Sequence, residues 1–145
     1  MTKDLKIKIF QDLNNPRSIG YLLNQLIDKD EKTLISILTT IRHISEQGGF
    51  PIPPHAKPLK EVNNEICEMR IKYDLNNLLR IYYFVNKEEK VMLLLNFIIK
   101  PDGRKFPADY EGKKGKKLLK EIGASVEYAL ELKSNKELLY TDLEI

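Results

Sequence analysis

The chain has 145 residues, a net charge of +3 and only 14 glycine and proline residues, values that fit one folded domain and exclude disordered and fibrous chains. No apolar run is long enough for a spanning helix, and the N-terminal residues alternate charged and aliphatic side chains where a signal peptide would carry an apolar block. We therefore expect a cytoplasmic protein without membrane contact. One cysteine, Cys67, and two histidines, His43 and His55, leave neither a disulfide nor a Cys/His metal set, so we expect no metal and no cofactor.

Charge is distributed unevenly along the chain. The net charge is +1 over residues 1–56, +6 over residues 57–120 and −4 over residues 121–145. A basic central block indicates an anionic partner such as nucleic acid, because Lys and Arg neutralise phosphates. The alternative, of similar weight, is that these lysines only form solvated faces.

The N-terminal third predicts a strand and a helical hairpin. Residues 5–13 alternate apolar and charged side chains, the period of a half-buried strand. Asn15 followed by Pro16 predicts an N-cap and the first position of a helix. Asp28 or Asp30 would cap a second helix, which we expect to run to about residue 47 and to stop at the glycines 48–49.

The middle of the chain predicts three strands. The prolines of residues 50–59 indicate an extended connection and not a strand interior. Residues 67–73 and 79–85 alternate on either side of the turn 74–77 and predict an antiparallel hairpin. The aliphatic run 91–99 is typical of a strand that is covered on both faces.

A last helix follows the loop 102–107. Its expected buried stripe comprises Leu118, Leu119, Ile122, Val126, Ala129 and Leu130, and its expected solvated face comprises Lys113, Lys114, Lys116 and Lys117. The order of elements predicts an α+β domain over residues 1–145, with an antiparallel-dominated sheet, an N-terminal helical hairpin, a C-terminal helix and all helices on one side of the sheet. Residues 134–145 read as an acidic C-terminal extension that is either solvated or folded over the basic surface.

Three basic residues occupy unusual positions. The sequence lacks G-x-S-x-G, P-loop and G-x-G-x-x-G motifs, whereas Arg70, Arg80 and Lys100 lie within or at the end of predicted strands. Arg80 is set in the apolar run L-L-R-I-Y-Y-F, and a buried guanidinium is costly unless it meets a carboxylate or an anionic ligand. Arg80 therefore binds an anion, or it forms a salt bridge to Glu68 or stacks on neighbouring aromatic rings.

Further candidates lie in the connecting segments. His55, Lys57 and Lys60 flank the entry to the sheet, where they either contact phosphate or remain exposed. Tyr110 precedes the last helix, where it either stacks on a base or caps that helix.

Four short segments in a fixed order resemble a known family. They are K-P-L-K at 57–60, E-M-R-I at 68–71, L-R-I-Y-Y-F-V at 79–85 and L-L-L-N-F-I-I-K at 93–100, followed by F-P at 106–107 and a helix. Over roughly residues 55–130 the chain resembles the phage-derived host-inhibition toxins of the HigB branch of the RelE/ParE superfamily.

The resemblance implies the toxin of a type II toxin–antitoxin system, a metal-independent endoribonuclease that cleaves mRNA on the ribosome and is neutralised by a HigA-like helix-turn-helix antitoxin. The ribose 2′-hydroxyl would attack the adjacent phosphorus, so the site must remove a proton, stabilise negative charge and protonate the leaving oxygen.

Single residues that match the motifs of this family give the site that the resemblance implies. Arg80 would stabilise the scissile phosphate, Arg70 would bind phosphate or hold the hairpin, and Lys100 and Tyr110 match positions at which relatives carry a basic residue and a tyrosine. The residues expected to contact RNA or the ribosome are His55, Lys57, Lys60, Arg104, Lys105, Lys113, Lys114, Lys116 and Lys117.

The chain also departs from the family. Where RelE-type enzymes carry lysines before the hairpin, it has Ile66 and Glu68. Two alternative functions follow: a ParE-like inhibitor of a topoisomerase, or a non-catalytic phage accessory module that binds a protein or nucleic acid.

Overall fold

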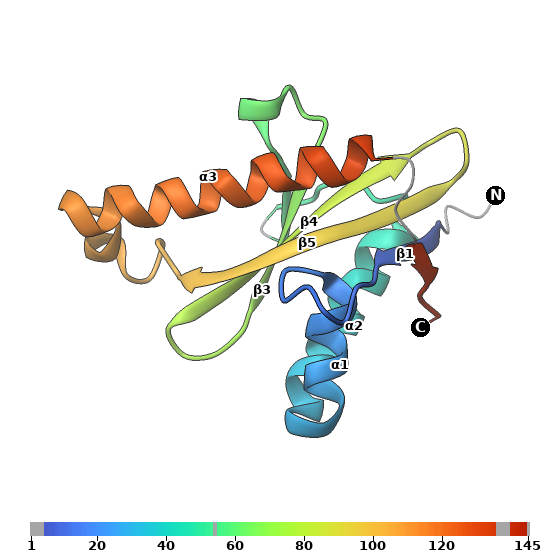
Figure 1. Ribbon diagram of the computed structural model, residues 1–145, viewed down its shortest axis with the longest axis horizontal. Helices are drawn as coiled ribbons and strands as arrows, with labels where there is room; N and C mark the ends of the chain where they lie inside the picture. The colour runs from blue at the N-terminus through green and yellow to red at the C-terminus, as the bar shows by residue number, and fades with distance from the viewer. Residues whose placement is uncertain (1–4, 54, 136–139, 145) are drawn as a thin grey trace.

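A central sheet covered by helices on both faces forms the protein, an α+β architecture (Figure 1). The computed structural model describes residues 5–53, 55–135 and 140–144. The strands are β1 (Lys6–Phe10), β2 (Ala56–Pro58), β3 (Cys67–Lys72), β4 (Asn77–Asn86), β5 (Val91–Pro101) and β6 (Tyr140–Asp142). The helices are α1 (Ile19–Lys29), α2 (Glu31–Glu46) and α3 (Gly112–Ser134), with short 3₁₀ turns η1 (Lys60–Val62) and η2 (Pro107–Tyr110).

The sheet is mostly antiparallel, with the strand order β2-β3-β4-β5-β1-β6. The predicted hairpin and the following strand form the meander β3-β4-β5. The first strand, β1, pairs in parallel with β5, and the α1–α2 hairpin supplies part of the connection that a parallel pair requires. A bulge between Tyr82 and Tyr83 shifts the register between β4 and β5.

Helices pack against both faces of the sheet, which corrects the expectation that all of them lie on one side. On one face α1 and α2 bury a core that includes Ile81 and Leu94, and on the other face α3 buries Tyr82 and Leu95. Ile81 and Tyr82 are neighbours in β4, and Leu94 and Leu95 are neighbours in β5, so the two members of each pair point to opposite faces. All four side chains are large and buried. The sheet therefore needs a helical cover on each face.

The first helix begins later than its sequence suggested. Ser18 caps α1 by accepting a hydrogen bond from the Tyr21 amide at 3.2 Å, so the prediction of Asn15 as N-cap was wrong. Asn15 instead accepts from the Arg17 amide at 2.9 Å and donates to the Tyr128 hydroxyl at 2.7 Å. Its side chain thus forms a local turn and a contact with α3. The first strand also ends at Phe10, three residues earlier than expected.

The boundaries of α2 follow the prediction. Asp30 caps the helix by accepting from the Thr33 amide at 3.0 Å. Gly48 and Gly49, which follow its end, both have a φ of 76°, a conformation that favours glycine. The proline-rich segment that follows was expected to be extended throughout but is not, because the amides of His55 and Ala56 both donate to the Ile52 carbonyl at 3.1 Å. Residues 56–58 add a short edge strand, β2, that the sequence did not predict. Because β2 lies at the edge of the sheet, its proline breaks no central ladder.

The buried stripe of α3 differs from the predicted one. Val126, Ala129 and Leu132 are buried, whereas Leu119 is 52% exposed. The C-terminal half of α3 packs on the sheet, whereas its first turns extend beyond the end of β5 (Figure 1). Leu119 lies in the N-terminal half, outside the buried cluster that α3 forms with the sheet. Among the described residues, no helix combines the length and apolar character needed to cross a bilayer.

The segment read as an acidic extension is partly a strand of the sheet. Ser134 ends α3, and β6 pairs with β1, where Lys6 and Asp142 form an ion pair at 3.4 Å. Residues 136–139 and 145 of the predicted extension lie outside the described residues. Because β6 occupies the edge of the sheet opposite β2, residues 140–144 do not cover the basic surface beside β2 and β3, which corrects that alternative.

Candidate active-site cleft

A cleft of about 300 Å³ lies between α3 and the face of β3 and β4 that α3 covers. Its sheet side is polar and its α3 side is apolar. It is lined by Lys57, Leu59, Glu61, Glu68, Arg70, Leu78, Arg80, Tyr82, Asp102, Gly103, Arg104, Tyr110, Leu119, Ile122 and Val126.

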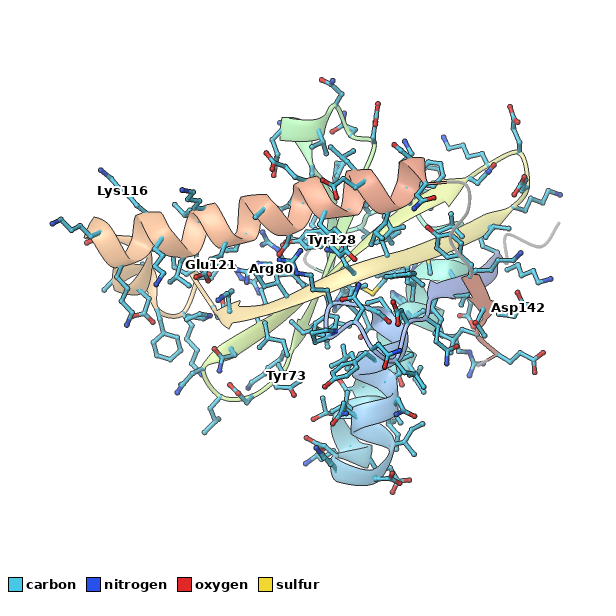
Figure 2. The ribbon with its side chains drawn as sticks, in the orientation of Figure 1. Tyr73, Arg80, Lys116, Glu121, Tyr128 and Asp142 are labelled. Carbon is cyan, nitrogen blue, oxygen red and sulfur yellow. The ribbon has the colours of Figure 1, made fainter. Side chains whose placement is uncertain are left out.

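The register of the strands gathers the charged side chains on one face. Arg70 of β3 lies directly opposite Arg80 of β4, and Glu68 lies opposite Tyr82. On the other side of β3, Lys57 of the edge strand β2 lies opposite Glu68. Because side chains two residues apart share a face, these five residues all point towards α3. Figure 2 shows the Arg80 side chain between α3 and the sheet.

Glu68 is the centre of the charged group. Glu68 is only 3% exposed. Its carboxylate lies 3.0 Å from Arg80 Nε, 3.5 Å from Arg70 Nε and 3.8 Å from Lys57 Nζ. Directly opposed like charges destabilise a strand pair, and the carboxylate offsets the repulsion between the two arginines. A buried carboxylate also requires such partners. The salt bridge between Arg80 and Glu68 that the sequence left as an alternative is therefore present.

Tyr110 fixes the other end of the Arg80 guanidinium. Arg80 Nη2 donates to the Tyr110 hydroxyl at 3.0 Å, and that hydroxyl donates to the Pro101 carbonyl at the end of β5. Two glycines admit the tyrosine: a Cβ at Gly103 would lie 2.9 Å from the Tyr110 ring, and a Cβ at Gly115 would lie 2.0 Å from the Tyr110 carbonyl carbon. The orientation of Arg80 is thus set by one contact at each side.

Three buried polar atoms of the cleft have no hydrogen-bond partner among the described residues: Arg80 Nη1, Tyr82 Oη and Arg70 Nε. The 3.5 Å approach of Arg70 Nε to Glu68 is an ion pair without hydrogen-bond geometry. Burial raises the pKa of Tyr82, and the negative charge of Glu68 adds to that effect, so the phenol keeps its proton and remains a donor. Buried donors without acceptors cost free energy, and their convergence on one cleft is typical of a site that binds an anion.

The cleft contains five of the predicted site residues: Lys57, Arg70, Arg80, Arg104 and Tyr110. Arg104 lies 3.5 Å from Asp102 in an exposed ion pair. Lys100 does not line the cleft, because it pairs with Glu121 of α3.

The other predicted residues lie elsewhere. His55 lies against His43 of α2, with 6.0 Å between the ring centroids. Lys60 is exposed on η1, and Lys105 donates to the Leu75 carbonyl at 2.9 Å. The first turns of α3 expose Lys113, Lys114, Lys116 and Lys117, which do not line the cleft. Figure 2 shows Lys116 pointing away from the sheet.

Sequence reasoning missed the acidic and apolar parts of the cleft. Glu68 was considered only as a salt-bridge partner, although its spacing from Arg70 already placed both on one face. Glu61 gave no signal. The α3 residues Leu119, Ile122 and Val126 were expected in the buried stripe of the helix but not at the site, because their position over the cleft depends on where α3 crosses the sheet.

The cleft can bind an oxyanion and hold a proton acceptor beside it. Arg80, Tyr82 and Arg70 supply donors, and the Glu68 carboxylate can accept a proton. Within the described ranges, no three His, Cys, Asp or Glu side chains cluster as metal ligands.

Comparisons with known proteins give no match: no family model fits the chain, and no curated protein and no solved structure is significantly similar to it.

Proposed function

We propose that the protein is a metal-independent endoribonuclease, the toxin of a type II toxin–antitoxin system with a RelE/ParE-like fold, which cleaves mRNA on the ribosome in the cytosol. The observation that carries the proposal is the group of unsatisfied buried donors of Arg80 and Tyr82 beside the Glu68 carboxylate. A phosphodiester would supply the missing acceptors.

The order of elements supports the proposal. A strand, a helical hairpin, a three-stranded meander and a last helix follow one another, as the resemblance to the HigB branch implies. The E-M-R-I segment lies in β3, and the segment that contains Arg80 lies in β4, so the two arginines expected at the site face each other.

The proposed reaction needs no group beyond these side chains. The 2′-hydroxyl attacks phosphorus, its proton passes to Glu68, the O2′–P bond forms and the P–O5′ bond breaks, which leaves a 2′,3′-cyclic phosphate. Arg80 Nη1 and Tyr82 Oη donate to the phosphoryl oxygens as negative charge develops. Lys57 donates a proton to O5′, because arginine does not give up its proton. Its Nζ lies 3.8 Å from the Glu68 carboxylate.

One observation favours a second candidate, a non-catalytic binding module. Glu68 already neutralises part of the charge of Lys57, Arg70 and Arg80, as a purely structural ion-pair network would. The two candidates differ in what Glu68 does: a structural carboxylate supports the fold, whereas a catalytic one must accept a proton.

Inducible expression in a bacterial host tests the proposal. New protein, new DNA and transcript ends are followed together for the wild type, Glu68→Gln and Arg80→Lys. The controls are Glu46→Gln and Arg42→Ala, which alter an exposed Glu–Arg pair on α2, at 3.0 Å and outside the cleft. Thermal unfolding of each purified variant confirms that it folds.

We expect the wild type and both controls to stop translation and to create new transcript ends. Glu68→Gln keeps an acceptor for Arg80 but cannot take a proton, so it should fold, bind RNA at least as tightly and lose cleavage by about 100-fold or more. Cleavage that survives Glu68→Gln would refute the catalytic role of Glu68. Harmless expression of folded wild type would favour the binding module, and arrest of DNA synthesis with intact transcripts would favour a topoisomerase inhibitor.

A further inference from the structure

The cleft has two distinguishable ends. Leu78, Arg80 and Tyr82 follow one another on the same face of β4, with about 7 Å between successive side chains along the strand. Leu78 pairs with Lys100 near the end of β5, so Asp102, Arg104 and Tyr110 lie at that end of the cleft. Tyr82 shares a buried cluster with Leu59, so Leu59 and the following turn η1 lie at the other end.

The charged side chains of Lys57, Glu68, Arg70 and Arg80 form the floor of the cleft, and the wall opposite this charged floor is apolar. One face of α3 lines the cleft with residues spaced three and four apart, Leu119, Ile122 and Val126. Leu59 continues this wall towards η1. Leu119 remains 52% exposed although it is large and apolar. An apolar wall above a charged floor suits a ligand with one flat apolar part and one anionic part.

Glu61 of η1 places a second carboxylate in the cleft. In the part of the chain that the structure describes, this carboxylate has neither an ion pair nor a hydrogen bond. It lines the same cleft as the Tyr82 hydroxyl, which has no hydrogen-bond partner among the described residues. A free carboxylate repels a phosphate and is useful there only if it accepts hydrogen bonds from another part of the ligand.

We propose that the η1 end of the cleft is a base-reading pocket that takes one unpaired guanine nucleotide, with its phosphate on Arg80 and its base between the α3 wall and Glu61. The inference rests on the proposed function and adds the identity of the base. A cleft of about 300 Å³ is at the lower limit for small-molecule sites, which suits one nucleotide and excludes a duplex.

Guanine fits because of its hydrogen-bond pattern. Its N1–H and N2–H groups are adjacent donors that point in the same direction and match the two oxygens of one carboxylate. Adenine and cytosine present one amino group beside a ring acceptor that the carboxylate would repel, and uracil presents a single N–H between two acceptors.

Binding of the four nucleoside 3′-monophosphates, measured by titration calorimetry, tests the proposal. The proteins are the wild type, Glu61→Gln and the control Glu65→Gln, which changes a nearby exposed carboxylate that pairs with Lys133 at 3.4 Å and does not line the cleft. Inorganic phosphate is titrated separately to report on anion binding at Arg80 alone.

We expect the wild type and Glu65→Gln to bind guanosine monophosphate about tenfold or more tightly than uridine monophosphate, the effect of hydrogen bonds to a charged acceptor. Glu61→Gln should reduce that ratio to below about threefold without weakening phosphate binding. Equal binding of all four nucleotides, or a guanine preference that survives Glu61→Gln, would overturn the inference and leave the proposed function intact. Failure of the wild type to bind any nucleotide or phosphate would overturn both.

Discussion

Glu68 of β3 and Arg80 of β4 form an ion pair at 3.0 Å in which both side chains are less than one-tenth exposed. The pair is buried within a cleft that also contains unpaired donors, so it is both a structural contact and the centre of the proposed site. The two roles predict different responses to substitution.

Removal of one partner should cost more stability than removal of both. The single variant Arg80→Met leaves the Glu68 carboxylate buried with only its weaker partners, and we expect a loss of about 3–5 kcal/mol in the free energy of unfolding. The matching single variant is Glu68→Leu. The double variant Arg80→Met/Glu68→Leu should lose clearly less than the sum of the two single changes. Urea denaturation of the four proteins gives the coupling energy, and additive losses would show that the pair is not coupled.

Tyr82→Phe should separate stability from binding. The buried Tyr82 hydroxyl has no hydrogen-bond partner in the described part of the chain, so its removal should raise the free energy of unfolding by about 1 kcal/mol. The same change removes a donor from the cleft and should weaken phosphate binding severalfold. Denaturation and phosphate titration of one preparation measure both effects. Unchanged phosphate affinity would exclude the hydroxyl from the anion site.

Two glycines of α3 should respond oppositely to alanine. A Cβ at Gly123 would meet no atom of the described residues within 4 Å, so Gly123→Ala should stabilise the protein by about 0.5–1 kcal/mol through helix propensity. A Cβ at Gly115 would lie 2.0 Å from the Tyr110 backbone, so Gly115→Ala should displace η2, lower the melting temperature and reduce activity. A Gly115→Ala protein as stable and active as Gly123→Ala would refute the close packing of Tyr110.

Acid should weaken the cap of α2. Hydrogen bonds from the side chain and amide of Thr33 hold the pKa of Asp30 below its ordinary value of 3.8. A folded-state pKa that is depressed contributes stability above the unfolded value, and that stability is lost as the pH falls through the folded value. Asp30→Asn keeps a capping acceptor without a titratable group.

Asp30→Asn should therefore lose less stability than the wild type between about pH 6 and about pH 2, a window that spans the ordinary and the depressed aspartate pKa. The control is Asp28→Asn, which changes a neighbouring exposed carboxylate outside the cap. Equal acid sensitivity of Asp30→Asn and the wild type, measured by urea denaturation at each pH, would contradict this assignment.

Local patterns predicted most of the fold. The period of two located β3 and β4, and Asp30 and the paired glycines located the boundaries of α2. These signals depend on neighbours in sequence. The distribution of helices over both faces was missed, since it depends on how β1 inserts beside β5 and where α3 crosses the sheet. A single strand pattern does not carry that information.

The sequence predicted the basic residues of the candidate site but not its acidic and apolar residues. Arg80 was identifiable because a guanidinium in an apolar strand needs a partner. Glu61 was not, because η1 meets β4 and α3 only in the folded chain. Lys100 was assigned to the site from its position after a strand, and the pairing with Glu121 of α3 shows why position alone was insufficient.

The parallel pairing of β1 with β5 also bears on the order in which the protein folds. β3, β4 and β5 are joined by short turns, whereas Lys6 of β1 finds its partner Val91 only after most of the chain has been made. Contacts between distant segments form slowly because loop closure must come first. We therefore expect the meander, which holds the charged floor of the cleft, to form early, and the α1–α2 layer to become fixed only when β1 enters the sheet.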